Sequence, residues 1–351
     1  MFFTLMINFS LLTRIWYRQN KRDLPWRTTK NPYFIWLSEI ILQQTRVNQG
    51  LSYFLAFKEK YPTVKDLAKS NEREVLKLWQ GLGYYSRARN LHAAAKQIMN
   101  DFKGEFPNEY KDLKKLKGVG DYTAAAIASF SFDLPHATVD GNVYRVLSRF
   151  FGDHTPIDTT KGKKVFDAYA NEVLAKDQAA EHNQAIMELG ALICSPKQPK
   201  CLSCPLQDGC LAARKGIQHE LPAKSKKTKV TKRYFNYLFS GKDNIMIIQR
   251  DKNGIWKNLY QFPLIETSEK AEIALLKNEA SKEWGVKIVE EKPYCTYKHI
   301  LSHQHIFAQF WKCKPIKNKT NKSIITVSID EFDDYPVPRL IERFMQENEM
   351  D

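Results

Sequence analysis

Four of the six cysteines of this 351-residue chain crowd into the stretch between positions 194 and 210. A chain with this feature has to fold so that the four thiols come close together. Four thiolates at a spacing of C-x6-C-x2-C-x5-C suit either an iron-sulfur cluster or a structural zinc ion. Such crowding favours a metal site in a reducing compartment over a disulfide framework. The candidate ligands are Cys194, Cys201, Cys204 and Cys210.

The composition indicates a folded protein that binds a polyanion. Hydrophobic residues make up 43% and charged residues 26%, as in globular proteins. The excess of 54 Lys and Arg over 39 Asp and Glu, a net charge of +15, predicts affinity for nucleic acid. No apolar run approaches the roughly 18 residues of a membrane span, and the apolar start, with Met1 or Met6 as the first residue, lacks the features of a secretory signal. We therefore expect a monomeric cytoplasmic protein without membrane contacts, associated with the nucleoid if the source is bacterial.

The pattern along the chain predicts two domains. Residues 1–220 show helical spacing of apolar residues throughout, and Asn31 with Pro32 is typical of a helix start. Residues 221–233 are rich in Lys and poor in large apolar residues, as in a solvated linker. Residues 234–351 combine two β-rich stretches with a helix expected over 269–284. The prediction is an all-α domain, a basic linker and an α+β domain.

Two motifs in the helical part point to DNA chemistry. Gly118, Val119 and Gly120 form a glycine turn before an Ala-rich helix, and such a turn lets backbone N–H groups face a phosphate. Asp140 follows at the expected start of another helix, where it can be an ordinary N-cap or a functional carboxylate. Neither motif alone decides between a structural and a functional role.

Together these motifs resemble the helix-hairpin-helix DNA glycosylase superfamily, and within it the MutY adenine glycosylases. The likeness spans most of residues 8–220. It implies two helical lobes with an active site between them and one 4Fe-4S cluster on the four cysteines. It rests on the hairpin, the Asp140 segment, the cysteine loop and the stretches Leu24–Arg27, Trp36–Thr45 and Gly81–Leu91.

The resemblance implies a catalytic pair of carboxylates. Adenine leaves deoxyribose readily only when its ring is protonated, and the sugar then becomes cationic. Glu39 lies in an apolar helix, where desolvation is expected to keep it protonated, while Asp140, beside Asn142, is expected to stay ionised. Tyr122 stands where strand-cleaving members of the superfamily carry a Lys, which predicts a glycosylase that leaves an abasic site.

The resemblance also implies how the base is reached. Enzymes that act on a base flip it out of the stack. Tyr84 matches the family's wedge beside the opposite base, with Gln44, Thr45 and Leu82 near it. Residues matching the lining of the adenine pocket are Trp26, Arg27 and Gln184, the last of which is often Glu in the family.

The second domain resembles the Nudix-like domain of the same family, beginning at Ile255–Pro263. Lys282 occupies a place that binds metal in working Nudix hydrolases, so no Mg²⁺-dependent hydrolase site is expected. Leu301, Ser302 and His303 match the Phe-Ser-His tip that senses 8-oxoguanine, with Leu in place of Phe. Alternating histidines around this tip are expected to pack on a polar face, although a metal site is an alternative.

The sequence thus favours a glycosylase for adenine opposite 8-oxoguanine or guanine in double-stranded DNA. Three alternatives remain: a glycosylase and lyase for oxidised pyrimidines, a DNA-binding iron-sulfur protein without catalysis, and a nucleotide pyrophosphohydrolase. The first alternative is disfavoured by Tyr122, which stands in place of a lyase Lys. The second is disfavoured by the presence of both Glu39 and Asp140, and the third by Lys282.

Overall fold

The computed structural model describes residues 2–225, 230–250, 254–316 and 323–348. The chain divides into two compact units. The first unit consists of Met1–Lys69 and Asn90–Lys226, and the second of Ser70–Arg89 and Lys227–Asp351. The boundary near Arg89 falls inside helix α6 (Ser86–Asp101), so sequence order and spatial grouping differ there. The predicted domains 1–220 and 234–351, with a linker over 221–233, remain a prediction, and residues 226–229 of that linker lie outside the described part.

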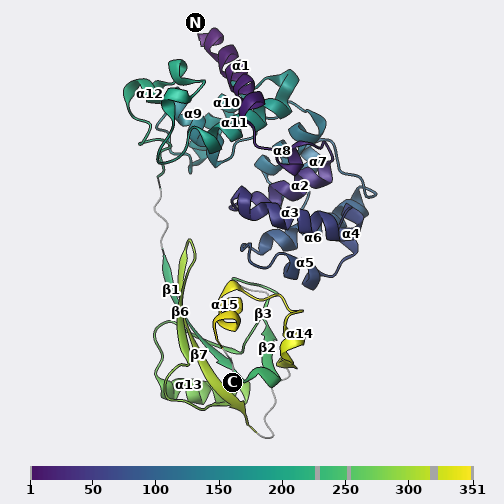
Figure 1. The fold of residues 1–351 in the computed structure, drawn as a ribbon, viewed down its shortest axis with the longest axis vertical. Coiled ribbons are helices and arrows are strands. Elements are labelled where there is room, and N and C mark those ends of the chain that lie inside the picture. The colour runs from purple at the N-terminus through teal and green to yellow at the C-terminus, as the bar shows by residue number, and fades with distance from the viewer. Residues whose placement is uncertain (1, 226–229, 251–253, 317–322, 349–351) are drawn as a thin grey trace. The chain divides into compact units, whose positions relative to one another are not determined.

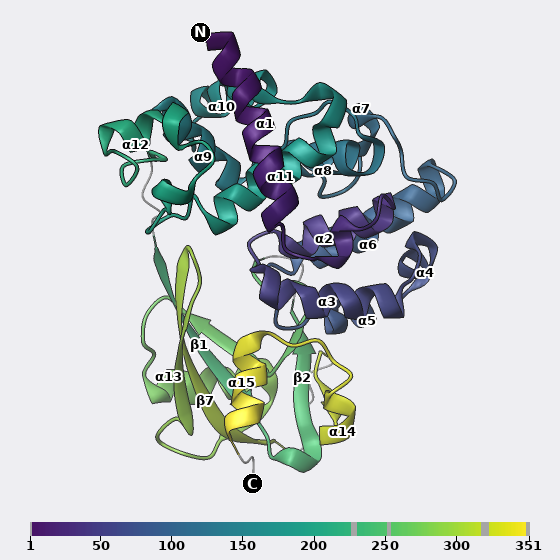
Figure 2. The ribbon, with the colours of Figure 1, turned by 45° about the horizontal axis from the view of Figure 1, so that its top comes forward.

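The described residues of the first unit form helices joined by short loops (Figure 1). Figure 2 shows that the N-terminal helix lies along α11, which the short distances between their backbones support. The helices, in chain order, are α1 (Phe2–Asn20), η1 (Pro25–Arg27), α2 (Pro32–Leu42), α3 (Val47–Lys60), α4 (Val64–Lys69), α7 (Tyr110–Leu113), α8 (Asp121–Phe132), α9 (Gly141–Phe151), α10 (Thr160–Val173), η2 (Lys176–Gln178), α11 (Ala179–Leu192), η3 (Cys201–Ser203), η4 (Gln207–Gly209) and α12 (Leu211–Lys215).

Side-chain caps begin the two helices that matter most for the site. The Asn31 side chain accepts a hydrogen bond from the Tyr33 backbone N–H, and Pro32 is the first residue of α2, which confirms the predicted start. Asp140 caps α9 by accepting from the Val143 backbone N–H at 2.7 Å. Both caps fix where the chain enters the helix.

Helix α8 lies at the centre of the first unit and packs against both α2 and α11. All residues from Thr123 to Ser131 are buried, and most are Ala or Ser. Small side chains let neighbouring helices approach closely, so the first residues of α8 come near α2. No helix in the described part of the chain combines the length and the apolar character that a membrane span needs.

The second unit combines two small sheets with helices. The Ser70–Arg89 segment contributes α5 (Glu72–Leu78) and the start of α6. Thr231–Arg233, at the start of β1, fall in the stretch that was predicted to be a linker. The elements after the first unit are β1 (Thr231–Phe239), η5 (Lys242–Asn244), β2 (Ile245–Gln249), β3 (Tyr260–Gln261), β4 (Leu264–Thr267), α13 (Ile273–Glu279), the π-helix η6 (Ala280–Trp284), β5 (Val286–Ile288), β6 (Cys295–Ile300), β7 (Gln304–Pro315), β8 (Ile325–Val327), α14 (Ile329–Phe332) and α15 (Arg339–Glu347).

The larger sheet has the order β4-β1-β7-β5, with β6 also paired to β7, and the smaller sheet has the order β3-β2-β8. Strands β1 and β7 are parallel, with Phe235 opposite Ala308, and the other pairs are antiparallel. The described structure thus confirms the predicted mixture of strands and helices. The helix expected over 269–284 begins later, at Ile273, and continues as a π-helix.

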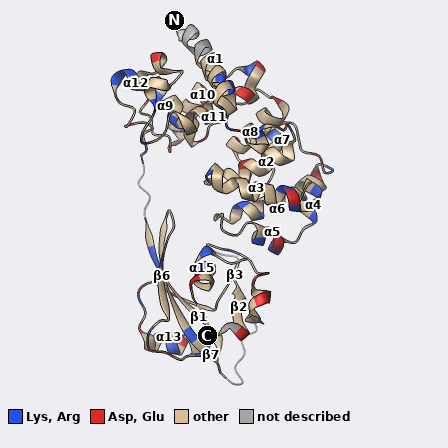
Figure 3. Cartoon of the chain, in the orientation of Figure 1, with Lys and Arg blue, Asp and Glu red and all other residues tan. Residues whose placement is uncertain are grey.

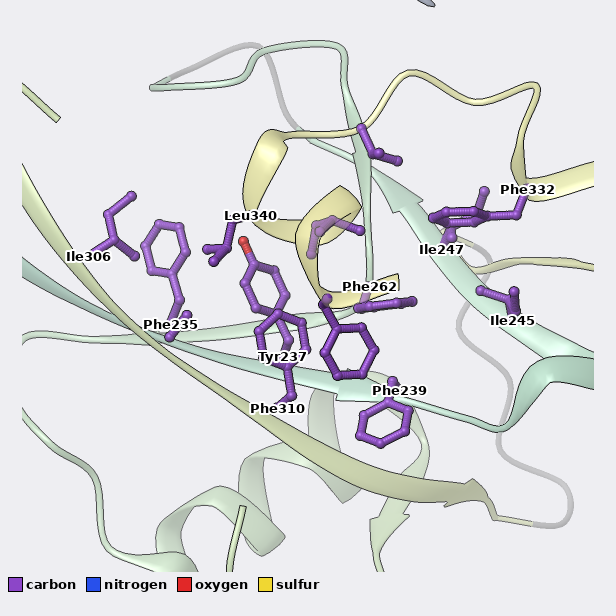
Figure 4. Packing of buried hydrophobic residues seen from close by; sticks show 14 of the residues in the cluster. Phe235, Tyr237, Phe239, Ile245, Ile247, Phe262, Ile306, Phe310, Phe332 and Leu340 are labelled. Atoms are coloured by element: carbon purple, nitrogen blue, oxygen red, sulfur yellow. The ribbon is translucent and has the colours of Figure 1, made fainter. Parts of the chain in front are cut away.

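Aromatic side chains fill the main core of the second unit (Figure 4). Phe235, Tyr237 and Phe239 point from one face of β1 toward α15, and Phe310 stacks on Phe344 of α15 at 4.1 Å. Residue Leu238 and its neighbours on the opposite face pack against α13 instead. Strand β1 is therefore buried on both faces from Phe235 to Phe239, where four of the five residues are apolar or aromatic.

Hydrogen bonds within the second unit hold the Ser70–Arg89 segment to the residues that follow the linker. The Asn258 amide donates to Glu72 at 2.6 Å, and Arg89 donates to the Lys257 carbonyl at 2.8 Å. The hydroxyl of Tyr85 donates to the Val337 carbonyl at 3.3 Å. No local sequence pattern indicates this association, because more than a hundred residues separate the two parts of the chain.

Candidate active site and cysteine loop

The first unit contains a cavity of about 940 Å³ that is lined by nine of the predicted site residues, including all four of the predicted catalytic residues. Its wall includes side chains from α2, α8, α9, α11 and the loop before α2. Sequence reasoning missed three charged residues of this wall, Arg22, Arg46 and Glu188. The predicted residues that line the cavity are Trp26, Arg27, Glu39, Gln44, Thr45, Tyr122, Asp140, Asn142 and Gln184.

Glu39 is a buried carboxyl group in the cavity wall, only 7% exposed. The Tyr122 hydroxyl donates a 2.6 Å hydrogen bond to Glu39 Oε2. Burial raises the pKa of Glu39 to about 7, and the nearby charge of Asp140 adds to this, while Tyr122 and the Arg27 guanidinium act in the opposite direction. A carboxyl group with such a pKa carries its proton near neutral pH and can donate it.

Asp140 is buried, which raises its pKa overall, and it accepts hydrogen bonds that stabilise its ionised form and offset part of this rise. Its Oδ1 accepts from the Val143 N–H at 2.7 Å, and its Oδ2 accepts from the Asn142 amide at 2.8 Å. The N-terminus of α9 also favours a negative charge at this position.

Asn142 is held between Asp140 and the cysteine loop. Arg145 donates to Asn142 Oδ1 at 2.8 Å and to the Cys194 carbonyl at 2.7 Å. Gly190 of α11 lies against Asn142 so closely that a Cβ at position 190 would be 2.6 Å from the Asn142 Cβ. The start of α9 is therefore fixed by contact with α11 and with the backbone of the loop.

The far wall of the cavity is formed by residues matching the family's base pocket. Trp26 is buried and meets Phe54 edge-to-face at 5.1 Å. Gln184 on α11 accepts a 2.6 Å hydrogen bond from the Tyr17 hydroxyl. Glu188 lies one turn after Gln184 on the same helix. This i, i+4 spacing was the signal that could have placed Glu188 in the pocket.

The loop that follows α2 supplies two more of the predicted residues. Gln44 has a φ of 56°, a left-handed conformation that turns the chain sharply. The Thr45 N–H donates to the Leu42 carbonyl at 3.1 Å. This turn places both residues on the cavity wall.

The predicted hairpin turn is present just before α8. Gly118 has a φ of +78°, and a Cβ there would be 2.7 Å from the Asn90 Cβ. Val119 is buried and anchors the turn, while Gly120 is the N-cap residue of α8 and makes no side-chain cap. The backbone N–H groups at the start of α8 are therefore open to an anion.

The four clustered cysteines line one small cavity, together with Arg149. The Arg149 guanidinium donates to Cys194 Sγ at 3.3 Å and to the Ser195 carbonyl at 2.7 Å. In the described part of the chain, no three His, Cys, Asp or Glu side chains are arranged around a single ion. A 4Fe-4S cluster takes one thiolate at each of its four irons. Four thiols that line one cavity therefore suit such a cluster better than they suit a single metal ion.

The short helix α12, which follows Cys210, ends in two cationic residues, Arg214 and Lys215. Lys and Arg are blue in Figure 3.

The second unit carries the remaining predicted residues. Tyr84 has a φ of 47° and is 52% exposed. It follows Gly81 and Gly83, which both have positive φ, whereas Leu82 between those two glycines is buried. The Tyr84 hydroxyl lies 3.0 Å from Ser302 Oγ, so the predicted wedge and the predicted lesion sensor are hydrogen-bonded. Leu301 packs against the aromatic core, while Ser302 and His303 are exposed in the turn between β6 and β7.

Comparison with known proteins finds relatives of both parts of the chain. Residues 37–172 match the family model of the HhH-GPD superfamily base excision DNA repair proteins, and residues 234–347 match that of the NUDIX domain. The adenine DNA glycosylase of Buchnera aphidicola subsp. Schizaphis graminum is 35% identical over 304 residues, which cover 86% of this chain and 84% of the relative. The human adenine DNA glycosylase is 39% identical over 217 residues, 59% of this chain and 40% of the relative.

A solved structure of a thermostable thymine-DNA glycosylase has a TM-score of 0.56 at 30% identity and covers 60% of this chain and 98% of its own. This similarity agrees with the helical architecture of the first unit. By its sequence relatives, its helical glycosylase fold and its NUDIX domain, the chain belongs to the adenine DNA glycosylase family of the helix-hairpin-helix superfamily.

Proposed function

We propose that this protein removes adenine from A:8-oxoguanine and A:G mispairs in double-stranded DNA and leaves an abasic site. The observation that carries the proposal is that one cavity is lined by both Glu39, a carboxyl group whose pKa burial raises to about 7, and Asp140, which accepts hydrogen bonds from Val143 and Asn142. These are the two groups that cleavage of a purine glycosidic bond requires.

The chemistry follows from the positions of these groups. Glu39 gives its proton to the ring of the flipped-out adenine, and the electron pair of the glycosidic bond stays with the departing base. The sugar becomes an oxocarbenium-like cation, which the carboxylate of Asp140 stabilises. Water then adds to the sugar carbon and releases a proton, so that an abasic sugar and free adenine result.

The cavity supports hydrolysis without strand cleavage. A lyase step needs an amine that forms a Schiff base with the sugar. No lysine is among the described residues that line the cavity. By the resemblance to the family, Tyr122 matches the position of the lyase amine. Trapping with borohydride is therefore expected to give no covalent adduct between the protein and DNA.

The cysteine loop is proposed to hold one 4Fe-4S cluster on Cys194, Cys201, Cys204 and Cys210. The thiols surround one cavity, and Arg149 points a charged donor at one of the sulfurs. When bound, the cluster would supply a rigid cross-link of the loop. Arg214 and Lys215 in the adjoining α12 could then contact DNA phosphates.

The second unit is proposed to recognise the base opposite adenine. Ser302 and His303 are exposed hydrogen-bonding groups in a tight turn, and Tyr84 is an exposed aromatic residue next to Ser302. This combination suits insertion into a duplex and hydrogen bonding to a modified guanine. Leu301 packs into the core, so the aromatic contact of the family's Phe has no counterpart here.

Excision from defined duplexes tests the proposal. Purified protein in molar excess is incubated with duplexes that carry adenine opposite 8-oxoguanine, guanine, cytosine or thymine, and the products are separated with and without alkali. We expect alkali-dependent cleavage opposite 8-oxoguanine and guanine alone. Cleavage without alkali would indicate the alternative lyase, and absence of any cleavage with intact binding would indicate a non-catalytic DNA-binding protein.

A further inference from the structure

Glu188 is a charged side chain in the cavity wall for which the proposed chemistry has no role. Its side chain is 1% exposed, yet burial of a carboxylate is costly unless it is paired. Two guanidinium groups supply the pairing. Arg22 donates to Oε1 at 2.9 Å and to Oε2 at 2.6 Å, and Arg27 donates to the same atoms at 2.9 and 2.7 Å.

This double pairing fixes Arg27 in one orientation. The Arg27 Nη1 also donates to the Arg22 carbonyl at 3.1 Å, and its guanidinium lies 5.6 Å from the ring centre of Tyr17. The Arg22 backbone N–H donates to Glu188 as well, at 3.0 Å. The carboxylate therefore organises the loop before η1 as well as the side chain that reaches into the cavity.

The pairing also sets the charge of the wall. Arg22 and Arg27 carry two positive charges, and Glu188 cancels one of them. Arg27 lines the same cavity as Glu39 and acts electrostatically on its carboxyl group. A larger positive charge in this low-dielectric wall would pull the proton off Glu39.

We propose that Glu188 is a positioning residue for the base pocket: it holds Arg27 against the wall and cancels one of the two guanidinium charges, so that Glu39 keeps the proton it donates. The inference rests on the proposed function of Glu39. It adds a residue that contacts neither the base nor the sugar and acts through Arg27.

Other groups also face Glu39 and must be held constant in a test. Tyr122 approaches from α8, Asp140 from the start of α9, and Arg27 from η1. Arg22, Arg46 and Glu188 are the other charged residues of the cavity wall. Substitution of Glu188 by Gln leaves the identity of every other residue of the wall unchanged and changes the charge of the wall by one unit.

The test is the pH dependence of adenine excision by Glu188→Gln under single-turnover conditions. The variant leaves two guanidinium charges facing one amide. We expect the rate near pH 7.5 to fall about tenfold, the loss of rate at rising pH to begin about one pH unit lower than in the wild type, and activity to recover at acidic pH. A rate lowered by the same factor at every pH would show a purely structural role and overturn the proposal.

Two further variants separate charge from contact. Arg22→Gln combined with Glu188→Gln restores the wild-type charge of the wall, and we expect its pH profile to return most of the way to that of the wild type. A profile that stays with Glu188→Gln would refute the electrostatic role. Glu181→Gln is the matched control, because Glu181 also lies on α11 and pairs with Arg18 at 2.7 Å, but at the surface; its profile should match the wild type.

A measurement without DNA distinguishes failure of this inference from failure of the proposed function. The carbon-13 signal of the Glu39 carboxyl group, identified by its loss in Glu39→Gln, is titrated in the wild type and in Glu188→Gln. We expect the midpoint to move to lower pH in the variant. An unchanged midpoint overturns the inference even if adenine is excised, and a shifted midpoint supports the role of Glu188 even in a protein that excises none.

Discussion

The Tyr122 hydroxyl and Glu39 Oε2 are joined by a 2.6 Å hydrogen bond across the interface of α8 and α2. A donor to the ionised carboxylate lowers the pKa of Glu39 and partly offsets the effect of burial. In Tyr122→Phe this donor is absent. We therefore expect excision to persist to higher pH, with the descending part of the rate profile moved up by about one unit.

The control for this prediction is Tyr33→Phe. Tyr33, which is on α2, is buried as well, but its hydroxyl donates to the Tyr61 carbonyl and Tyr33 does not line the cavity. The same loss of a buried hydroxyl should leave the pH profile unchanged. A profile of Tyr122→Phe that moves to lower pH would contradict the direction of the effect.

The elevated pKa of Glu39 has a cost in stability. The folded protein binds this proton up to about pH 7, whereas the unfolded chain releases it near 4.5, so wild-type stability falls as the pH rises between these values. Glu39→Gln has no such dependence. Relative to the wild type, its free energy of unfolding should increase by about 3 kcal/mol from pH 4.5 to pH 8. Denaturant unfolding at the two pH values measures the difference, and a gap that stays constant with pH would refute the prediction.

Gly118 and Gly120 should respond differently to alanine. At Gly120 a Cβ meets no atom within 4 Å, and the residue is not in the left-handed region. Gly120→Ala should keep its melting temperature and yet bind duplex DNA about tenfold more weakly, because the methyl group separates the phosphate from the backbone N–H groups. Gly118→Ala should lose stability as well, since its Cβ would overlap Asn90. Equal DNA affinity of Gly120→Ala and wild type would exclude the hairpin from phosphate binding.

Substitution of one of the four clustered cysteines should lower the iron content of the protein, whereas substitution of a cysteine elsewhere should not. In Cys204→Ala we expect loss of iron, of the visible absorption of the protein and of protease resistance between residues 194 and 210. Cys313→Ala removes a buried thiol on β7 that packs in the second unit, and it should retain iron. Zinc in place of iron in the purified wild type would support the alternative metal.

The turn between β6 and β7 should control partner discrimination. With Ser302→Ala and His303→Ala combined, we expect similar excision rates opposite 8-oxoguanine and guanine, while the chemistry itself remains. Because Ser302 also contacts Tyr84, the Tyr84→Phe variant is needed to separate the two effects. Unchanged preference for 8-oxoguanine in the double variant would remove this turn from lesion recognition.

The sequence predicted local features well and long-range pairings poorly. Asp140 and Asn31 could be recognised as caps, because an N-cap depends only on the next few residues. The partnership of Glu188 with Arg22 could not, since it joins residues 166 positions apart. Similarly, no local pattern indicates that Glu72 bonds to Asn258 or that Leu301 turns into the core.

Gly190 has a consequence for how this enzyme tolerates change. Because a methyl group at this position would collide with Asn142, α9 can begin against α11 only while position 190 has no side chain. The position of Asp140 at the start of α9 thus depends on empty space as much as on any bond. We expect substitutions on the face of α11 that points away from α9 to be tolerated. A methyl group at Gly190 should inactivate the enzyme without contacting a reacting atom.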